Sequence, residues 1–125
     1  MLLFVAMSAC GTLDRGEPSP PSNNETDTDN GPALSFATDI FPVLTADCSK
    51  CHGSGGIAAS SAFRLASTAK ASYDSVAALV STDNPDQSTL LQRASGKSHV
   101  GGVILNTSSP DYELIRNWIA QGAQP

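Results

Sequence analysis

The chain of 125 residues is long enough for one small domain and too short for two. Its formal net charge of −5 is unevenly placed: residues 11–33 hold five acidic residues and one basic residue, whereas residues 34–125 hold seven acidic and six basic residues. Because a nearly neutral domain offers no basic stripe to neutralise phosphates, the composition argues against nucleic-acid binding.

Residues 1–10, MLLFVAMSAC, contain a short apolar run, then the small residues Ser8 and Ala9, then Cys10. This segment resembles a bacterial lipoprotein signal, in which the cysteine becomes the lipid-bearing N-terminus. The alternative, a membrane-spanning anchor, would need about 20 apolar residues. We therefore expect a cleaved leader, an exported protein of the periplasm or cell envelope, and a lipid anchor at Cys10.

Residues 11–33 are dominated by Pro, Ser, Asn, Asp, Thr and Gly, and Leu13 is their only large apolar residue. Such a segment cannot bury enough apolar surface to offset its ordering entropy. It predicts a flexible, partly extended tether between the lipid and a domain at residues 34–125. The alternative is a loop packed on that domain.

The domain opens with a predicted helix that leads to a pair of cysteines. Asp39 is the expected N-cap, and Pro42 is tolerated because it falls in the first turn. One face of this helix carries residues at steps of three and four that we expect in the core: Ile40, Val43, Leu44 and Cys48.

Residues 48–52 read CSKCH, which is a CxxCH motif. Two thiols one helical turn apart can add to two vinyl groups on adjacent rings of one haem, and the imidazole that follows can bind the iron from the same side. The motif therefore predicts one covalent haem c, bonded to Cys48 and Cys51, with His52 as an axial iron ligand.

Three other interpretations of the cysteine pair stay open. A zinc site needs four ligands, and the chain could supply them as Cys48, Cys51, His52 and His99, although adjacent residues are awkward ligands for one tetrahedron. A thioredoxin-like redox pair would need a βαβ setting, and the sequence shows none. The third interpretation is a structural disulfide.

The middle of the domain is predicted to contain short helices joined by loops. Residues 53–62 are rich in Gly and Ser and indicate a loop. A helix is expected over residues 72–80, with one apolar side made of Tyr73, Val76, Ala77 and Val80. Residues 83–86 indicate a turn, and a further short helix ends at Gly96 and packs through Leu90, Leu91 and Ala94.

The last predicted helix has the clearest signals. Ser109 is its N-cap, Pro110 suits the first helical position, and Asp111 and Glu113 complement the helix dipole. Gly122 ends the helix. Its apolar face consists of Tyr112, Ile115, Trp118 and Ile119. No run alternates as strands do, so we predict an all-α domain with long loops.

Three segments together resemble the planctomycete-type cytochrome c domain. They cover most of residues 36–123 and read Phe36-x3-Ile40-x-Pro42-x-Leu44-x3-Cys48-x2-Cys51-His52-Gly53, Pro85-Asp86-x-Ser88-x-Leu90-Leu91, and Ile115-x2-Trp118-Ile119-x2-Gly122-Ala123. The resemblance implies a small cytochrome c-like helical fold around one covalent haem, electron transfer, and redox partner proteins in the cell envelope. No nucleophile triad or acid–base pair accompanies the motif, so we do not expect an enzyme.

Members of that family commonly use a methionine before the last helix as the sixth iron ligand, but the only methionines here are Met1 and Met7, in the predicted leader. His99 stands in the corresponding region, and two glycines follow at 101 and 102 that would let the backbone approach the porphyrin. We therefore predict His99 as the second axial ligand. The alternatives are Lys97, or a sixth position that is empty or filled by water, as in a haem sensor or a peroxidase-like protein.

Two further groups of residues allow a functional and a plainer interpretation. Trp118 and Tyr112 could relay electrons, but we expect them to bury apolar area against the haem or the first helix. Three basic residues could form a docking patch for an acidic partner or simply a solvated surface, namely Lys50, Arg93 and Lys97. The oligomeric state is not indicated by any pattern.

Overall fold

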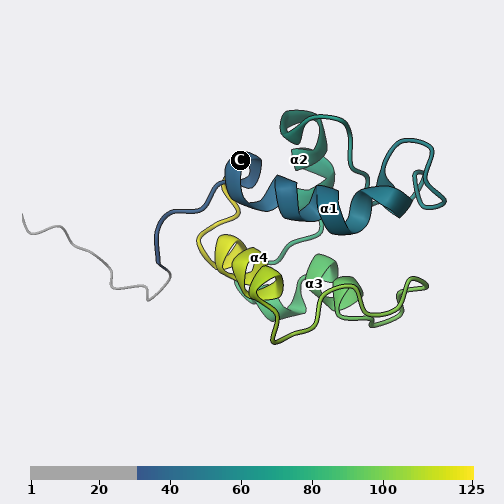
Figure 1. The fold of residues 1–125 in the computed structure, drawn as a ribbon. Helices are drawn as coiled ribbons and strands as arrows, with labels where there is room; N and C mark the ends of the chain where they lie inside the picture. The colour runs from purple at the N-terminus through teal and green to yellow at the C-terminus, as the bar shows by residue number, and fades with distance from the viewer. Residues whose placement is uncertain (1–30) are drawn as a thin grey trace, which may run out of the picture.

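The computed structural model describes residues 31–125, and Figure 1 shows their arrangement. This part of the chain contains helices and no strand, and a single isolated bridge pairs Gly53 with Leu65. The all-α prediction is therefore confirmed. The predicted leader, Cys10 and residues 11–30 of the predicted tether lie outside the described residues. No helix within residues 31–125 is long and apolar enough to cross a membrane.

The helical segments of residues 31–125 follow one another with loops of very different length between them. In chain order they are η1 (Phe36–Ile40), α1 (Phe41–His52), α2 (Ala69–Ala77), η2 (Pro85–Gln87), α3 (Thr89–Ala94) and α4 (Pro110–Ala120). The two longest loops follow α1 and α3. They extend from the same end of the molecule in Figure 1.

The first helical segment begins earlier than predicted. Ser35 has an extended backbone, and its hydroxyl accepts a hydrogen bond from the Thr38 N–H at 3.2 Å. The Asp39 carboxylate accepts one in return from the Ser35 N–H at 2.8 Å. The prediction of Asp39 as the N-cap is therefore wrong. Ser35 is the cap, and Asp39 completes a reciprocal cap from inside the helix.

A π-helical turn separates this cap from α1. The Phe41 N–H bonds to the Phe36 carbonyl, five residues before it. Pro42 follows immediately, has no N–H to donate, and crowds the carbonyl four residues earlier. The wider turn lies where that crowding occurs. It lets η1 and α1 run on as one helical stretch, with Ile40 and Leu44 fully buried on the predicted face.

Helix α2 also begins before its predicted start. The Thr68 hydroxyl caps it by accepting from the Ala71 N–H at 3.2 Å, so the helix starts at Ala69 rather than at residue 72. Ser72 is buried inside it, where its hydroxyl accepts from the Ala66 N–H at 2.9 Å and donates to the Thr68 carbonyl at 2.8 Å. These bonds tie the first turn of α2 to the loop before it, a contact that the local sequence pattern did not indicate.

The later elements agree with the prediction. The Ser109 hydroxyl accepts from the Tyr112 N–H at 3.2 Å, and Pro110 is the first helical residue of α4. Gly96 and Gly122 have φ values of +98° and +101° just beyond α3 and α4, a conformation that favours glycine. The four residues predicted for the apolar face of α4 are all buried.

Aromatic side chains join the two ends of the domain. Phe36 is 1% exposed, and its ring centre lies 5.6 Å from that of Trp118 and 5.4 Å from that of Tyr73. The Gln124 carbonyl accepts from the Trp118 indole N–H at 2.7 Å and from the Phe36 N–H at 2.9 Å. Trp118 therefore packs against the first helical segment, as the core interpretation predicts, and it fixes the C-terminal segment beside η1 (Figure 1).

Candidate functional site

The CxxCH motif forms the last turn of α1. Cys48 is half-buried and Cys51 is exposed, and both are free thiols rather than partners in a disulfide. Burial raises the pKa of the Cys48 thiol to about 11, with further contributions from the negative charge of Asp47 and from Cys51. Cys48 is therefore held in its neutral form at physiological pH in the folded chain.

This difference between the two thiols predicts how the haem-free chain is alkylated. At about pH 8, iodoacetamide should modify Cys51 first, because only the thiolate reacts and Cys48 is both protonated and partly covered. The rate for Cys48 should rise with pH until about 11. Mass spectrometry of peptides from a time course would measure both rates. Equal rates in the folded chain at about pH 8, matching those in denaturant, would contradict the assignment.

His52 is oriented by the loop that follows it. Its Nδ1 lies 2.9 Å from the Phe63 carbonyl oxygen and 3.1 Å from the Ser61 hydroxyl oxygen. Because a carbonyl can only accept, Nδ1 carries the proton, and Nε2 keeps a free lone pair that can bind a metal. The Phe63 ring packs 4.7 Å from the imidazole, centre to centre. Neither Ser61 nor Phe63 belongs to a local motif, so no sequence pattern indicates their contact with His52.

His99 is held in the same manner from the loop after α3. Its Nδ1 lies 2.9 Å from the Gly102 carbonyl oxygen, which again leaves Nε2 free. A Cβ on Gly101 would come within 2.9 Å of the His99 ring, so this glycine lets the backbone pass close to the imidazole. Gly102 adopts a φ of +74°. The prediction for Gly101 was a close approach of the backbone to the porphyrin. In the described structure Gly101 allows a close approach of the backbone to the His99 ring.

The two histidines lie beside one another although His52 ends helix α1 and His99 belongs to the loop after α3. Their ring centres are 6.2 Å apart, and the ring planes are inclined by only 14°. An imidazole–metal bond is about 2 Å long, and the centre of a five-membered ring lies about 1 Å from each of its atoms. Two imidazoles on opposite sides of one metal ion therefore have centres about 6 Å apart. The observed distance between the ring centres agrees with that value.

Large apolar side chains are exposed in the loops that are next to this pair along the chain. Within residues 31–125 the exposed large hydrophobic residues all belong to the loops that carry or follow the histidines, namely Ile57 (93%), Val100 (105%), Val103 (64%) and Ile104 (40%). A flat apolar group set between the two loops would cover such side chains, so the residues present fit a haem.

Two observations concern the other interpretations of the cysteine pair. Within the described residues, no group of three or more His, Cys, Asp and Glu side chains is gathered in a way that could hold a metal ion, as the zinc alternative requires. The same residues contain no strand that could form the βαβ setting of a thioredoxin-like pair.

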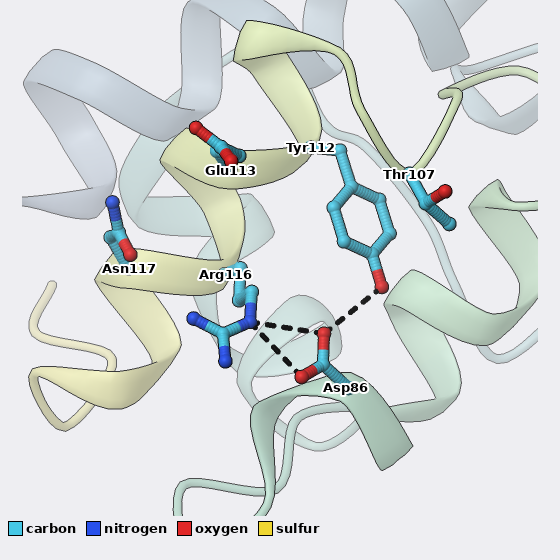
Figure 2. Close-up of a pocket in the computed structure, with 6 residues that line it drawn as sticks. All are labelled: Asp86, Thr107, Tyr112, Glu113, Arg116 and Asn117. Carbon is cyan, nitrogen blue, oxygen red and sulfur yellow. Dashed lines mark hydrogen bonds and ion pairs between the residues drawn. The ribbon is translucent and has the colours of Figure 1, made fainter.

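A separate hollow of about 360 Å³ lies against α4 and η2 (Figure 2). At its centre, Arg116 Nε donates to both carboxylate oxygens of Asp86 at 3.0 Å, and the Tyr112 hydroxyl donates to Asp86 Oδ1 at 3.3 Å. Burial and the neighbouring Asp86 raise the pKa of Tyr112. The ion pair is about half exposed and is worth at most about 1 kcal/mol. We interpret this ion pair as a contact that holds η2 against α4.

In comparisons with known proteins, no family model, no curated protein and no solved structure matches this chain. The resemblance to the planctomycete-type cytochrome c domain therefore stays a prediction.

Proposed function

We propose that this protein is a monohaem c-type cytochrome that carries electrons. In this proposal Cys48 and Cys51 bond the haem through thioethers, and His52 and His99 are the two axial ligands of its iron. The observation that carries the proposal is the pair of nearly parallel imidazoles with ring centres 6.2 Å apart, one of which follows directly on the cysteine pair.

Each part of the chain has a defined task in this proposal. The last turn of α1 presents two thiols and one imidazole on one side of the group, and the loop after α3 presents the second imidazole. The Phe63 and Gly102 carbonyls hold the protons on the two Nδ1 atoms, which keeps each Nε2 available for the iron. When bound, the haem supplies the one-electron chemistry.

Two imidazole ligands favour electron transfer over catalysis. With both axial positions held by protein, a small molecule must displace a histidine before it can bind. Imidazole ligation also gives a lower potential than thioether ligation by methionine. We further propose export to the cell envelope and attachment to a membrane through a lipid at Cys10. Together these would tether a redox carrier to the membrane surface.

Haem content tests the proposal directly. Protein produced with a bacterial haem-attachment system should contain one haem per chain that stays with the polypeptide under denaturing conditions, measured as the pyridine haemochrome. The double variant Cys48→Ser/Cys51→Ser should contain no covalent haem. Lys70→Ala, at an exposed position on α2, serves as a control and should keep full haem content. Colourless wild-type protein with two alkylatable thiols would refute the proposal.

Ser61 should tune the potential of the bound haem. Its hydroxyl donates to the Phe63 carbonyl at 2.8 Å, the same oxygen that accepts from His52 Nδ1. The Ser61 oxygen is the more distant of the two acceptors near His52 Nδ1, at 3.1 Å against 2.9 Å for the Phe63 carbonyl. Freeing that carbonyl from its competing donor in Ser61→Ala should therefore outweigh the lost contact, strengthen the bond to His52 and make the imidazole a more basic ligand, which stabilises the oxidised iron. We expect a more negative midpoint potential in spectroelectrochemistry. Ser60→Ala, exposed and adjacent, should leave it unchanged.

A further inference from the structure

The backbone segment that orients His52 is attached both to the end of α1 and to helix α2. The Leu65 N–H bonds to the His52 carbonyl at 2.9 Å, and the Leu65 side chain is buried in the core. Two serine hydroxyls of α2 bond to the backbone of residues 64–66. The Phe63 carbonyl, which accepts from His52 Nδ1, comes immediately before these residues. Its position therefore depends on both attachments.

Ser75 and Ser72 make the attachments to α2. The Ser75 hydroxyl lies 2.6 Å from the Arg64 carbonyl oxygen and 2.9 Å from the Ser72 carbonyl oxygen, which is one turn back in its own helix. Its single proton can go to only one of these oxygens at a time, and the shorter distance favours Arg64. The Ser72 hydroxyl accepts from the Ala66 N–H at 2.9 Å. Residues 64 and 66 are thus both hydrogen-bonded to α2.

A hollow of about 560 Å³ is lined partly by His52 and the loop after it and partly by α2. Helix α2 contributes Ala71, Asp74 and Ser75 to this lining. Most of the lining residues from the loop are glycine, serine or alanine, whose side chains are too short to fill such a space. Since packed side chains do not join the loop to α2 across the hollow, the two serine hydroxyls make this attachment.

We propose that Ser75 is a positioning residue for the axial ligand His52 and thereby helps to set the potential of the bound haem. This inference rests on the proposed function, in which His52 binds the iron. The Ser75 hydroxyl holds the Arg64 carbonyl, and this fixes the adjoining peptide group, whose oxygen is the Phe63 carbonyl. That oxygen accepts the proton of His52 Nδ1. A firmly held Nδ1–H makes the imidazole a more basic ligand, which stabilises iron(III).

Removing the Ser75 hydroxyl should raise the midpoint potential of the haem-loaded full chain. In Ser75→Ala the Arg64 carbonyl loses its bond to α2, so the Phe63 carbonyl is held less firmly and the oxidised iron loses stabilisation. We expect the equilibrium to shift toward the reduced iron by roughly threefold or more, which is about 30 mV for a one-electron couple. Spectroelectrochemistry measures this shift. Its sign is opposite to that expected for Ser61→Ala.

The proton on His52 Nδ1 gives a second measurement, which does not depend on the potential. The reduced low-spin holoprotein is diamagnetic, so NMR can follow the exchange of this proton with solvent. We expect the exchange to be roughly tenfold faster in Ser75→Ala than in the wild-type protein, because the Phe63 carbonyl holds the proton less firmly.

Three control variants separate positioning from a general loss of stability. Ser75→Thr should restore the wild-type potential, because a helical threonine hydroxyl can occupy the same place and the hollow accepts the added methyl group. Ser67→Ala makes the same change as Ser75→Ala at an exposed position beside the segment and should leave both measurements unchanged. Ser109→Ala removes the N-cap of α4 and should lower the denaturation midpoint without moving the potential. Ser75→Ala itself should leave α2 folded, since alanine is the better helix former.

An unchanged or more negative potential in Ser75→Ala would overturn the proposal, and so would an equal rise in Ser67→Ala or Ser109→Ala. A rise that Ser75→Thr does not reverse would overturn it too, because the hydroxyl would then not be the cause. Haem content is measured first, by pyridine haemochrome. Wild-type protein without covalent haem would be a failure of the proposed function. Normal haem content with an unmoved potential in Ser75→Ala would be a failure of the positioning inference alone.

Discussion

Replacing His99 by alanine should convert the oxidised, haem-loaded protein from a six-coordinate low-spin state to a five-coordinate or water-bound high-spin state. His99 is the partner of His52 at 6.2 Å, and neither Cys51 nor Cys48 can replace it once both are bonded to the haem. The reduced variant should then bind carbon monoxide rapidly and at full occupancy, whereas the wild-type protein should bind it slowly. Absorption spectra of both oxidation states measure the change.

Two further variants make this prediction specific. His99→Met should restore a low-spin spectrum and raise the midpoint potential, since thioether ligation favours the reduced iron. Lys97→Ala, two residues away, should keep the wild-type spectrum. If His99→Ala itself stayed low-spin and closed to carbon monoxide, His99 could not be the ligand. The alternative of a haem sensor with an open sixth position would instead predict rapid carbon monoxide binding by the wild-type protein.

Replacing Trp118 by alanine should destabilise the domain by about 3–5 kcal/mol. Trp118 is fully buried, packs against Phe36, and donates its indole N–H to the Gln124 carbonyl at 2.7 Å. Its removal would leave a cavity between α4 and η1. The free energy of unfolding of the haem-loaded protein can be measured with guanidinium chloride and far-UV circular dichroism.

Graded controls separate the loss of packing from the loss of the hydrogen bond. Trp118→Phe should lower the free energy of unfolding by less, about 1–2 kcal/mol, because an aromatic ring still fills most of the space. The Gln124 carbonyl keeps a donor in that variant, the Phe36 N–H at 2.9 Å. Lys70→Ala, at an exposed position, should change stability by no more than about 0.5 kcal/mol. A cost below about 1 kcal/mol for Trp118→Ala would show that this contact does not hold the domain together.

Local signals predicted some helix boundaries and missed others for a physical reason. The Ser109–Pro110 pair was sufficient to predict where α4 begins, because a capping hydroxyl and a proline act only on neighbouring residues. At the first helix a similar local rule selected Asp39, but Ser35 is the cap and Asp39 supports it. Both side chains can cap a helix, and the choice depends on where the apolar face, beginning at Phe36, packs into the core.

The residues that orient the two histidines could not be predicted from spacing. Ser61 and Phe63 reach His52 only because the loop after α1 turns back on the helix, where the Leu65 N–H bonds to the His52 carbonyl at 2.9 Å. Gly102 reaches His99 through a tight turn of its own loop. Loop conformations of this kind are decided by backbone hydrogen bonds that many sequences can make.

The sequence by itself determined the chemistry available to this protein: a cysteine pair one turn apart with a histidine directly after it, and no methionine beyond Met7 to serve as an iron ligand. It also determined an all-α domain, since apolar residues recur at helical steps and nowhere alternate. Only the tertiary structure decided that the His52 and His99 rings lie nearly parallel with their centres 6.2 Å apart. That distance depends on how α1, α3 and α4 pack, and packing joins residues whose separation along the chain carries no local signal.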